Sequence, residues 1–318
     1  MAAGPLVACY TVGMSLTYRD AQLDDAAAYC ALYVLIHPHQ VVTPAGIHHW
    51  WTTEPPCARR RTMVAESDGA VVAIGSASFD TWTSEVGTAS VSARVHPDYR
   101  RAGIGARLFD ELIGHLTAND ARLVHGISTN DPDTLAWCLH RGFSRSHELR
   151  FSSLDLTDQD ILPPVPMLPA GARTASAAEL TPVAVYPVDA AAIADEPGDV
   201  QSDQVPYDQW VTEVWQNPDT DLDLSTVVLI DDVPAAWTRA VTDRMTHRMW
   251  AGGTGTLREH RGKGLAKIAK SVALRRAAEA GITAAFASND ETNAAMLAVN
   301  TWLGYRPCAT QWTQIKTV

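Results

Sequence analysis

The chain has 318 residues, enough for two domains of ordinary size, each able to bury its own core. Its composition of 46% hydrophobic and 19% charged residues is typical of a globular protein in water, and its net charge of −11 argues against nucleic acid as the main partner. Residues 1–13 carry no basic residue and no apolar run long enough to cross a bilayer, so neither a signal peptide nor a membrane anchor is expected. Five cysteines without a C-x-x-C pair favour reduced thiols and a cytoplasmic location.

The first half of the chain alternates between strand-like and helix-like patterns. A short strand over 15–18 precedes a helix over 20–35. The histidines of 37–40 and 46–51 match no familiar spacing of metal ligands, so no metal site is expected, and these residues are expected to line the mouth of an acceptor site. Further predicted elements are a hairpin over 62–78 with its turn at Asp68-Gly69, a strand over 88–95, a strand over 121–127, a helix over 130–140 and a closing strand over 147–154.

A glycine turn follows the strand that ends at Val95. Gly103 and Gly105 would let backbone N–H groups approach a ligand closely, and the N-terminus of the helix that begins there adds a partial positive charge. Three arginines, Arg100, Arg101 and Arg107, lie in the same stretch. The turn is therefore suited to a phosphate or pyrophosphate group.

A proline-rich segment divides the chain. Four prolines between residues 155 and 172 preclude a regular helix, so we expect a first domain over 1–156, a linker over 157–172 and a second domain over 173–318. The second half repeats the order of elements in the first. Its predicted elements are helices over 177–188 and 207–215, a hairpin over 226–237, a strand over 248–257, a helix over 263–280, a strand over 283–287 and a helix over 293–302.

The glycine turn itself occurs twice. Gly264 follows Gly103 by 161 positions, and both copies keep the pattern Arg-x-x-Gly-x-small. An Arg-Gly-Phe or Leu-Gly-Tyr sequence follows each turn at nearly the same spacing, 37 residues from Gly105 to Gly142 and 38 from Ala266 to Gly304. The chain is therefore predicted to be a tandem repeat of one domain.

The two hexads, Arg100-x-x-Gly103-x-Gly105 and Arg261-x-x-Gly264-x-Ala266, resemble the acyl-CoA signature of the GNAT superfamily of acetyl-CoA-dependent N-acetyltransferases. The resemblance covers most of both halves. It implies an α/β fold with two tandem GNAT-like domains, each a mixed, largely antiparallel sheet flanked by helices. It also implies an acyltransferase that uses acetyl-CoA as cosubstrate.

The resemblance implies a coenzyme site in each copy. The pantetheine arm would add along the strand before the turn, the backbone of the turn would hold the pyrophosphate, and the N–H of Val95 or Leu257 would polarise the thioester carbonyl. An asparagine near the coenzyme arm matches Asn130 and Asn293. The residues carried over are Ala93, Arg94, Val95, Arg100, Arg101, Ala102, Gly103, Ile104, Gly105, Ala106 and Asn130 in the first copy, and Gly255, Thr256, Leu257, Arg261, Gly262, Lys263, Gly264, Leu265, Ala266, Lys267 and Asn293 in the second.

The catalytic groups depart from the family pattern. Many members carry a glutamate base in the strand before the turn, where this chain has Ala89 and Ala251, and a tyrosine acid where it has Cys138 and Asn300. A proton must still leave the ammonium before the amine attacks. Glu85 is the nearest carboxylate and is the candidate base, acting directly or through water, and the alternative is that Glu85 is a solvated charge on a loop.

The expected reaction is direct transfer of an acetyl group to a primary amine of a small molecule or peptide, such as an antibiotic or the amino sugar-cysteine precursor of mycothiol. Acidic residues concentrated over 195–223 favour a cationic acceptor, although they also serve solubility. The alternative is a non-catalytic protein that binds acyl-CoA as a sensor or scaffold, which the missing glutamate and tyrosine favour. The chain is expected to act as a monomer or homodimer, away from membranes.

Overall fold

The computed structural model describes residues 15–158 and 162–318, so the expectations for residues 1–13 and for Cys9 lie outside the described residues. In the first half, the ends of all but one of the predicted elements lie within a few residues of the expected positions. The helix expected over 20–35 begins at Ala26, after a single 3₁₀ turn over Leu23–Asp25. The elements are β1 (Leu16–Asp20), α1 (Ala26–Ile36), α2 (Pro44–Thr53), β2 (Arg61–Ser67), β3 (Ala70–Phe79), β4 (Thr88–Val95), α3 (Ile104–Ala118), β5 (Leu123–Thr129), α4 (Pro132–His140) and β6 (Ser144–Asp155).

The second half repeats this order with one shorter helical region. The helix expected over 177–188 starts at Pro182, whose ring suits a first helical position, and continues past Pro187. The helix expected over 207–215 is α6 followed by one π-helical turn over Val211–Trp215. The elements are β7 (Ala172–Ser176), α5 (Pro182–Ala194), α6 (Tyr207–Trp210), β8 (Thr226–Ile230), β9 (Val233–Asp243), β10 (Arg248–Thr256), α7 (Leu265–Glu279), β11 (Ala284–Asp290), α8 (Ala294–Trp302) and β12 (Arg306–Thr317).

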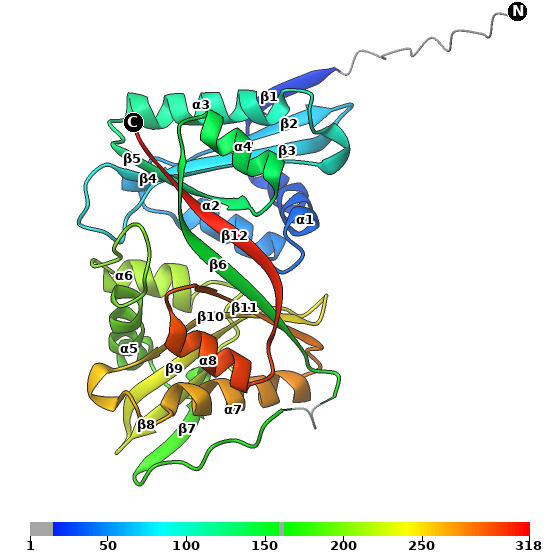
Figure 1. Cartoon of the computed structure of the whole chain (residues 1–318). Helices are drawn as coiled ribbons and strands as arrows, with labels where there is room; N and C mark the ends of the chain where they lie inside the picture. The colour runs from blue at the N-terminus through cyan, green and yellow to red at the C-terminus, as the bar shows by residue number, and fades with distance from the viewer. Residues whose placement is uncertain (1–14, 159–161) are drawn as a thin grey trace, which may run out of the picture.

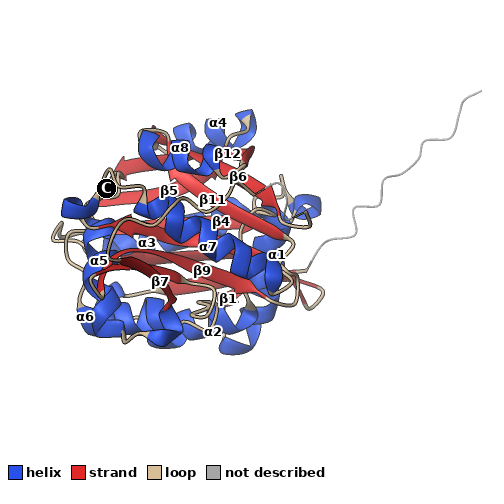
Figure 2. Ribbon diagram, turned by 90° about the horizontal axis from the view of Figure 1, so that it is seen from below, coloured by secondary structure: helices blue, strands red, loops and turns tan. Residues whose placement is uncertain are grey.

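The strands form one continuous sheet in the order β1-β2-β3-β4-β5-β12-β6-β11-β10-β9-β8-β7. All neighbouring strands pair antiparallel except β4 with β5 and β10 with β11. These two parallel pairs occupy matching places in the two halves. The expected fold class, two mixed and largely antiparallel units flanked by helices, is therefore confirmed, and the two units share one sheet (Figure 2).

The last strand of each repeat is exchanged. Residues 147–154 were expected to close the first unit, but β6 pairs with β11 of the second repeat and with β12. In return β12 takes the place beside β5 in the first repeat. Figure 1 shows both strands running diagonally across the middle of the molecule, so each repeat is completed by a strand of the other. The sequence analysis did not identify β12, nor β7 at the end of the proline-rich segment.

Helices cover both faces of the sheet. In the first repeat α3 packs its apolar stripe of Leu108, Leu112 and Leu116 on one face. Helices α1 and α2 cover the other face, where Tyr29 packs against Ile74, and they lie on the side of the second repeat (Figure 1). No helix of residues 15–158 and 162–318 combines the length and apolar character that crossing a bilayer requires.

Candidate active site between the repeats

Strands β4 and β5 separate after a short stretch of pairing. They pair in parallel only from Thr88 with Leu123 to Ser90 with His125. The rest of β4, up to Val95, has β3 on one side, and no strand within residues 15–158 and 162–318 pairs with its other side. An open strip of backbone thus runs along β4 toward the glycine turn.

The hydrogen bonds to β3 reveal which N–H groups face this open strip. The His96 N–H donates to Val72, and the Asp80 N–H donates to the Thr88 carbonyl. Since N–H direction alternates along a strand, the N–H groups of Ala93 and Val95 point to the open side, whereas the Arg94 N–H points to β3. Val95 is therefore oriented as expected of a group that polarises a thioester, and Arg94 can contribute only its side chain.

In the second repeat β10 and β11 separate in the same way, but the residue of β10 that matches Val95 lies one position earlier than expected. β10 and β11 pair only from Arg248 to Trp250. The Leu257 N–H, expected to face the thioester, donates to the Ala235 carbonyl instead. The residue that matches Val95 is Thr256, because each accepts a bond from the first arginine of its hexad: Arg100 Nε lies 3.1 Å from the Val95 carbonyl and Arg261 Nε lies 3.1 Å from that of Thr256.

Both glycine turns have the backbone that their sequences predict. Gly103 and Gly264 precede α3 and α7 with φ of 78° and 75°, in the left-handed region that glycine tolerates best. A Cβ at either glycine would meet nothing within 4 Å, so space lies open beside both turns. The first N–H groups of each helix have no intrahelical acceptor, which leaves them available to an anion.

Charge distinguishes the two turns. In the first, Arg101 pairs with exposed Asp133, while Arg100 Nε donates to the Val95 carbonyl at the end of β4. In the second, Asp195 accepts from both Arg258 and Arg261, and these bonds hold the pKa of Asp195 well below its usual range. At the first turn an exposed carboxylate thus pairs with one arginine, whereas at the second a single, less exposed carboxylate pairs with two.

The remaining cations and the two asparagines have other contacts. Arg107 stacks on Tyr18, and Lys267 stacks on Trp302 with its Nζ 5.0 Å from the ring centroid. The Asn130 amide bonds to β12, donating to Thr310 Oγ1 at 2.8 Å and accepting from Trp312 Nε1 at 3.2 Å. Asn293 caps α8 by accepting from the Met296 N–H, and Lys263 Nζ lies 3.3 Å from His260 Nδ1.

A cavity of about 470 Å³ lies between the two repeats and reaches the open strip of β4. Strand residues on both sides of the separation, Ser92 of β4 and Ile127 of β5, line it. Three tyrosine and tryptophan side chains of α1 and α2, namely Tyr29, Tyr33 and Trp50, form one wall. The second repeat supplies Glu213, Asn217, Asp219, Thr220, Arg239 and Val241.

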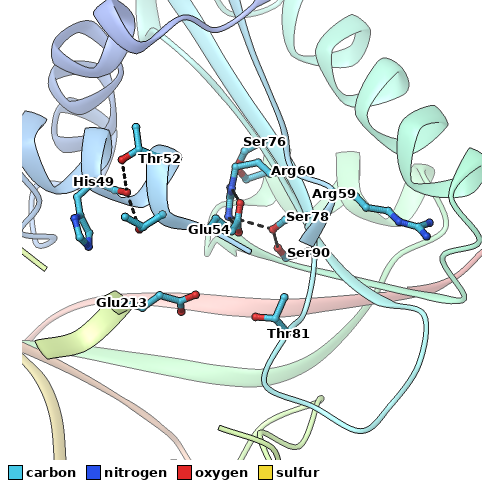
Figure 3. Close-up of polar contacts among 12 residues, drawn as sticks. His49, Thr52, Glu54, Arg59, Arg60, Ser76, Ser78, Thr81, Ser90 and Glu213 are labelled. Atoms are coloured by element: carbon cyan, nitrogen blue, oxygen red, sulfur yellow. Dashed lines mark hydrogen bonds and ion pairs between the residues drawn. The ribbon is translucent and has the colours of Figure 1, made fainter. Parts of the chain in front are cut away.

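Two carboxylates line this cavity, and both come from the second repeat. Asp219 accepts from the backbone N–H and the hydroxyl of Thr43, so it fastens the start of α2. Glu213 accepts one bond, from Gln209 Nε2 at 2.7 Å, and burial raises its pKa. Figure 3 shows Glu213 opposite Ser78 and the Glu54–Arg60 pair, of which Arg60 also lines the cavity. A half-buried carboxylate of raised pKa can accept a proton from an ammonium.

Glu85, the candidate base from the sequence, lies elsewhere. It is exposed on the loop between β3 and β4 and does not line the cavity. The sequence does not indicate Glu213, because the family pattern places the base within the repeat that it serves and Glu213 belongs to the other repeat. Of the two positions that replace the family tyrosine, Cys138 is buried with a raised pKa and Asn300 donates to Asn289.

In the second repeat, side chains fill the face that corresponds to the cavity. A Cβ on Gly255 would lie 2.2 Å from the Ala192 Cβ, so α5 packs directly on β10 there. Asp189 of α5 accepts from the indole N–H groups of Trp210 and Trp237, each at 2.7 Å. The second repeat thus has a glycine turn and an open strand edge, but α5 occupies the face of β10 at Gly255.

The acidic residues over 195–223 form many specific contacts. Among the described residues, no group of three histidine, cysteine, aspartate or glutamate side chains is arranged to hold a metal. The acidic side chains instead bond to neighbouring segments, several of them in the other repeat. These pairs are Asp195 with Arg258 and Arg261, Asp199 with Ser146, Asp203 with Ser84, Asp219 with Thr43, and Asp221 with Arg244.

Comparison with known proteins gives one family. The model of the Acetyltransferase (GNAT) family matches residues 27–143 and 192–305. A tandem GNAT protein from the clavulanic acid biosynthesis pathway superposes with a TM-score of 0.73 at 21% identity, over 95% of this chain and 98% of that chain. A GCN5-related N-acetyltransferase from Sphaerobacter thermophilus gives a TM-score of 0.68 at 17% identity, over 95% of each chain. A search of curated proteins found no match.

Proposed function

Because the chain belongs to the GNAT acetyltransferase family, we propose that it transfers an acetyl group from acetyl-CoA to a primary amine of a small molecule or peptide. The observation that carries the proposal is the open edge of β4, which leads into a cavity that also contains Glu213. Coenzyme, amine and base could then meet at one place. The first repeat is the catalytic one.

In this proposal the coenzyme binds by main-chain contacts. The first N–H groups of α3, at Ile104, Gly105 and Ala106, hold the pyrophosphate. The pantetheine lies along the open side of β4, and the Val95 N–H donates to the thioester carbonyl, where negative charge develops during attack. The Asn130 side chain supports this edge by holding β12 beside β5.

The reaction is direct. The ammonium of the acceptor gives one proton to Glu213, and the neutral amine attacks the thioester carbonyl carbon. A C–N bond forms, the C–S bond breaks, the second proton of the attacking nitrogen passes to the CoA thiolate through water, and Glu213 then releases its proton to solvent. The raised pKa of Glu213 favours this role, since a base whose pKa lies closer to neutral pH holds the proton better. An ammonium is also the charge that Glu213 and Asp219 attract, which supports a cationic amine group.

In this proposal the second repeat does not catalyse the transfer. Its glycine turn is intact, but α5 and the Asp189 cluster fill the acceptor face. The alternative for the whole chain is a non-catalytic sensor or scaffold that binds acyl-CoA, which Ala89 and Cys138 in place of the family glutamate and tyrosine favour.

The test is a thiol-release assay on the purified chain with acetyl-CoA and a panel of primary amines. Transfer predicts CoA release that depends on one class of amine, together with an acetylated product detected by mass spectrometry. Binding of acetyl-CoA without release for any amine would overturn the transferase proposal in favour of the sensor.

A further inference from the structure

We propose that the acceptor carries an acidic group, a carboxylate or a phosphate, in addition to its amine, and that the Arg94 side chain binds this group. The inference rests on the proposed function, because it names the class of amine that the same cavity takes. It comes from the charges that line the cavity and from how each is neutralised.

Three arginines line the cavity, and two of them have carboxylates nearby. Arg60 donates from Nε and Nη2 to Glu54, which makes a bidentate pair. Burial lowers the pKa of Arg239, and the nearby charges of Asp189 and Glu196 partly oppose that effect. Arg94 differs. Among the described residues its hydrogen-bond partners are His37 and Ser92, and neither is a carboxylate.

Arg94 is nevertheless held in place. Its Nε donates to His37 Nε2 at 3.0 Å and its Nη1 donates to Ser92 Oγ at 2.8 Å. Its guanidinium carbon lies 4.6 Å from the centroid of the Tyr33 ring. A guanidinium has five N–H groups, so these two bonds leave three for a ligand. A fixed guanidinium with spare N–H groups suits the paired oxygens of a carboxylate or phosphate.

The partner of Arg94 is itself fixed and uncharged. Burial and the neighbouring Arg94 lower the pKa of His37 to about 3, so its ring is neutral at pH 7. Since Nε2 accepts from Arg94, the ring proton lies on Nδ1, and a hydrogen bond to Gln311 of β12 then requires the amide to present its oxygen, not its Nε2, to Nδ1. His37 therefore orients Arg94 and leaves its positive charge uncompensated.

The positions of the two charges fit one ligand. Arg94 directly precedes Val95, the residue proposed to hold the thioester, and its side chain lines the cavity. Glu213 lies on the wall that the second repeat supplies. A molecule with its amine toward Glu213 and its acidic group on Arg94 would satisfy both charges, whereas a simple amine would leave the arginine without a counter-ion.

The experiment measures binding of matched ligands to the CoA-saturated, full-length chain by calorimetry. Each pair differs only in the acidic group: an amino acid and its amide test the carboxylate, and an amino sugar and its 6-phosphate test the phosphate. In at least one pair the acidic member should bind about tenfold tighter or more, as expected of hydrogen bonds to a charged group. Arg94→Gln should abolish that preference and Arg94→Lys should restore part of it.

Two results would overturn the inference. One is equal affinity, or no affinity, for both members of every pair, and the other is an acidic preference that survives Arg94→Gln. The thiol-release assay separates this inference from the transferase proposal. Release with neutral amines and no acidic preference contradicts only the role of Arg94, whereas Arg94-dependent binding without release contradicts only the transfer.

Discussion

Glu213 shows how a catalytic candidate can arise from a residue outside the repeat that it serves. The first repeat has alanine where the family carries its glutamate. Glu213, one of the two carboxylates that line its cavity, comes from the π-helical turn after α6 of the second repeat. Pattern matching compares a residue with its position in its own repeat, so it could find the loss at Ala89 but not the replacement. Only the docking of the two repeats brings Glu213 to the cavity.

Glu213→Gln is expected to lower kcat/KM for the amine about a hundredfold or more at pH 7, because the amide keeps the shape but cannot accept the proton. Burial raises the pKa of Glu213 above its ordinary 4.5, so activity of the wild type should fall as pH drops through that raised value and protonates the base. The variant should lose this acidic limb of the pH profile while its Kd for acetyl-CoA stays unchanged.

Glu85→Gln is the matched control, since Glu85 is exposed and does not line the cavity. It should leave kcat/KM and the pH profile as in the wild type. The assignment would be contradicted if Glu85→Gln impaired turnover and Glu213→Gln did not.

A second residue-scale prediction concerns Asp189, which is 4% exposed and accepts from two indole N–H groups. Asp189→Ala removes both acceptors, so Trp210 and Trp237 keep buried donors without partners. We expect the free energy of unfolding to fall by about 2–4 kcal/mol, which urea denaturation would measure. An unchanged urea midpoint would mean that these bonds do not hold α5 against the sheet.

Among the elements, the glycine turns are the parts that the sequence predicts best. Their backbone follows from local chemistry: a strand end, a residue of positive φ, and a helix start, all within ten residues. Strand β12 is the opposite case. The sequence of β12, Arg306 to Thr317, mixes polar and apolar residues. The position of this strand in the sheet depends on the free edge of β5, which lies far away in the sequence.

Gly103→Glu and Gly264→Glu form a matched pair that tests which turn binds coenzyme for catalysis. Both glycines have similar positive φ and open space beside them, so the cost of the substitution in backbone strain should be nearly equal, about 1–2 kcal/mol. Each variant places a carboxylate where a pyrophosphate would bind. Gly103→Glu should abolish thiol release. Gly264→Glu should leave the rate of thiol release within about twofold of the wild type, which corresponds to less than about 0.5 kcal/mol. The reverse outcome would move catalysis to the second repeat.

At the scale of the whole molecule, the repeats depend on each other in two ways. The cavity needs walls from both, as the contacts of Asp219 with Thr43 illustrate. The sheet also needs both, because β6 and β12 each pair across the middle. The tandem repeat could be predicted from the two hexads, since duplication leaves local signatures. The strand exchange could not be predicted. β6 and β12 each follow the Gly-aromatic pair of their own repeat, and no local feature of the sequence specifies which sheet edge each strand joins.

The exchange predicts how fragments of the chain fold. In a fragment of residues 1–156, β5 lacks β12, and β6 lacks both β11 and β12, so three strand edges are left unpaired. A chimera that joins residues 1–143 to residues 306–318 should place β12 beside β5 in its native register, with the Gln314 amide again donating to Ser128. Thermal melts followed by circular dichroism should show a cooperative transition for the chimera and none for the fragment. A fragment that melts as cooperatively as the chimera would show that β6 can close its own repeat, and the dependence of one repeat on the other would then be limited to the walls of the cavity.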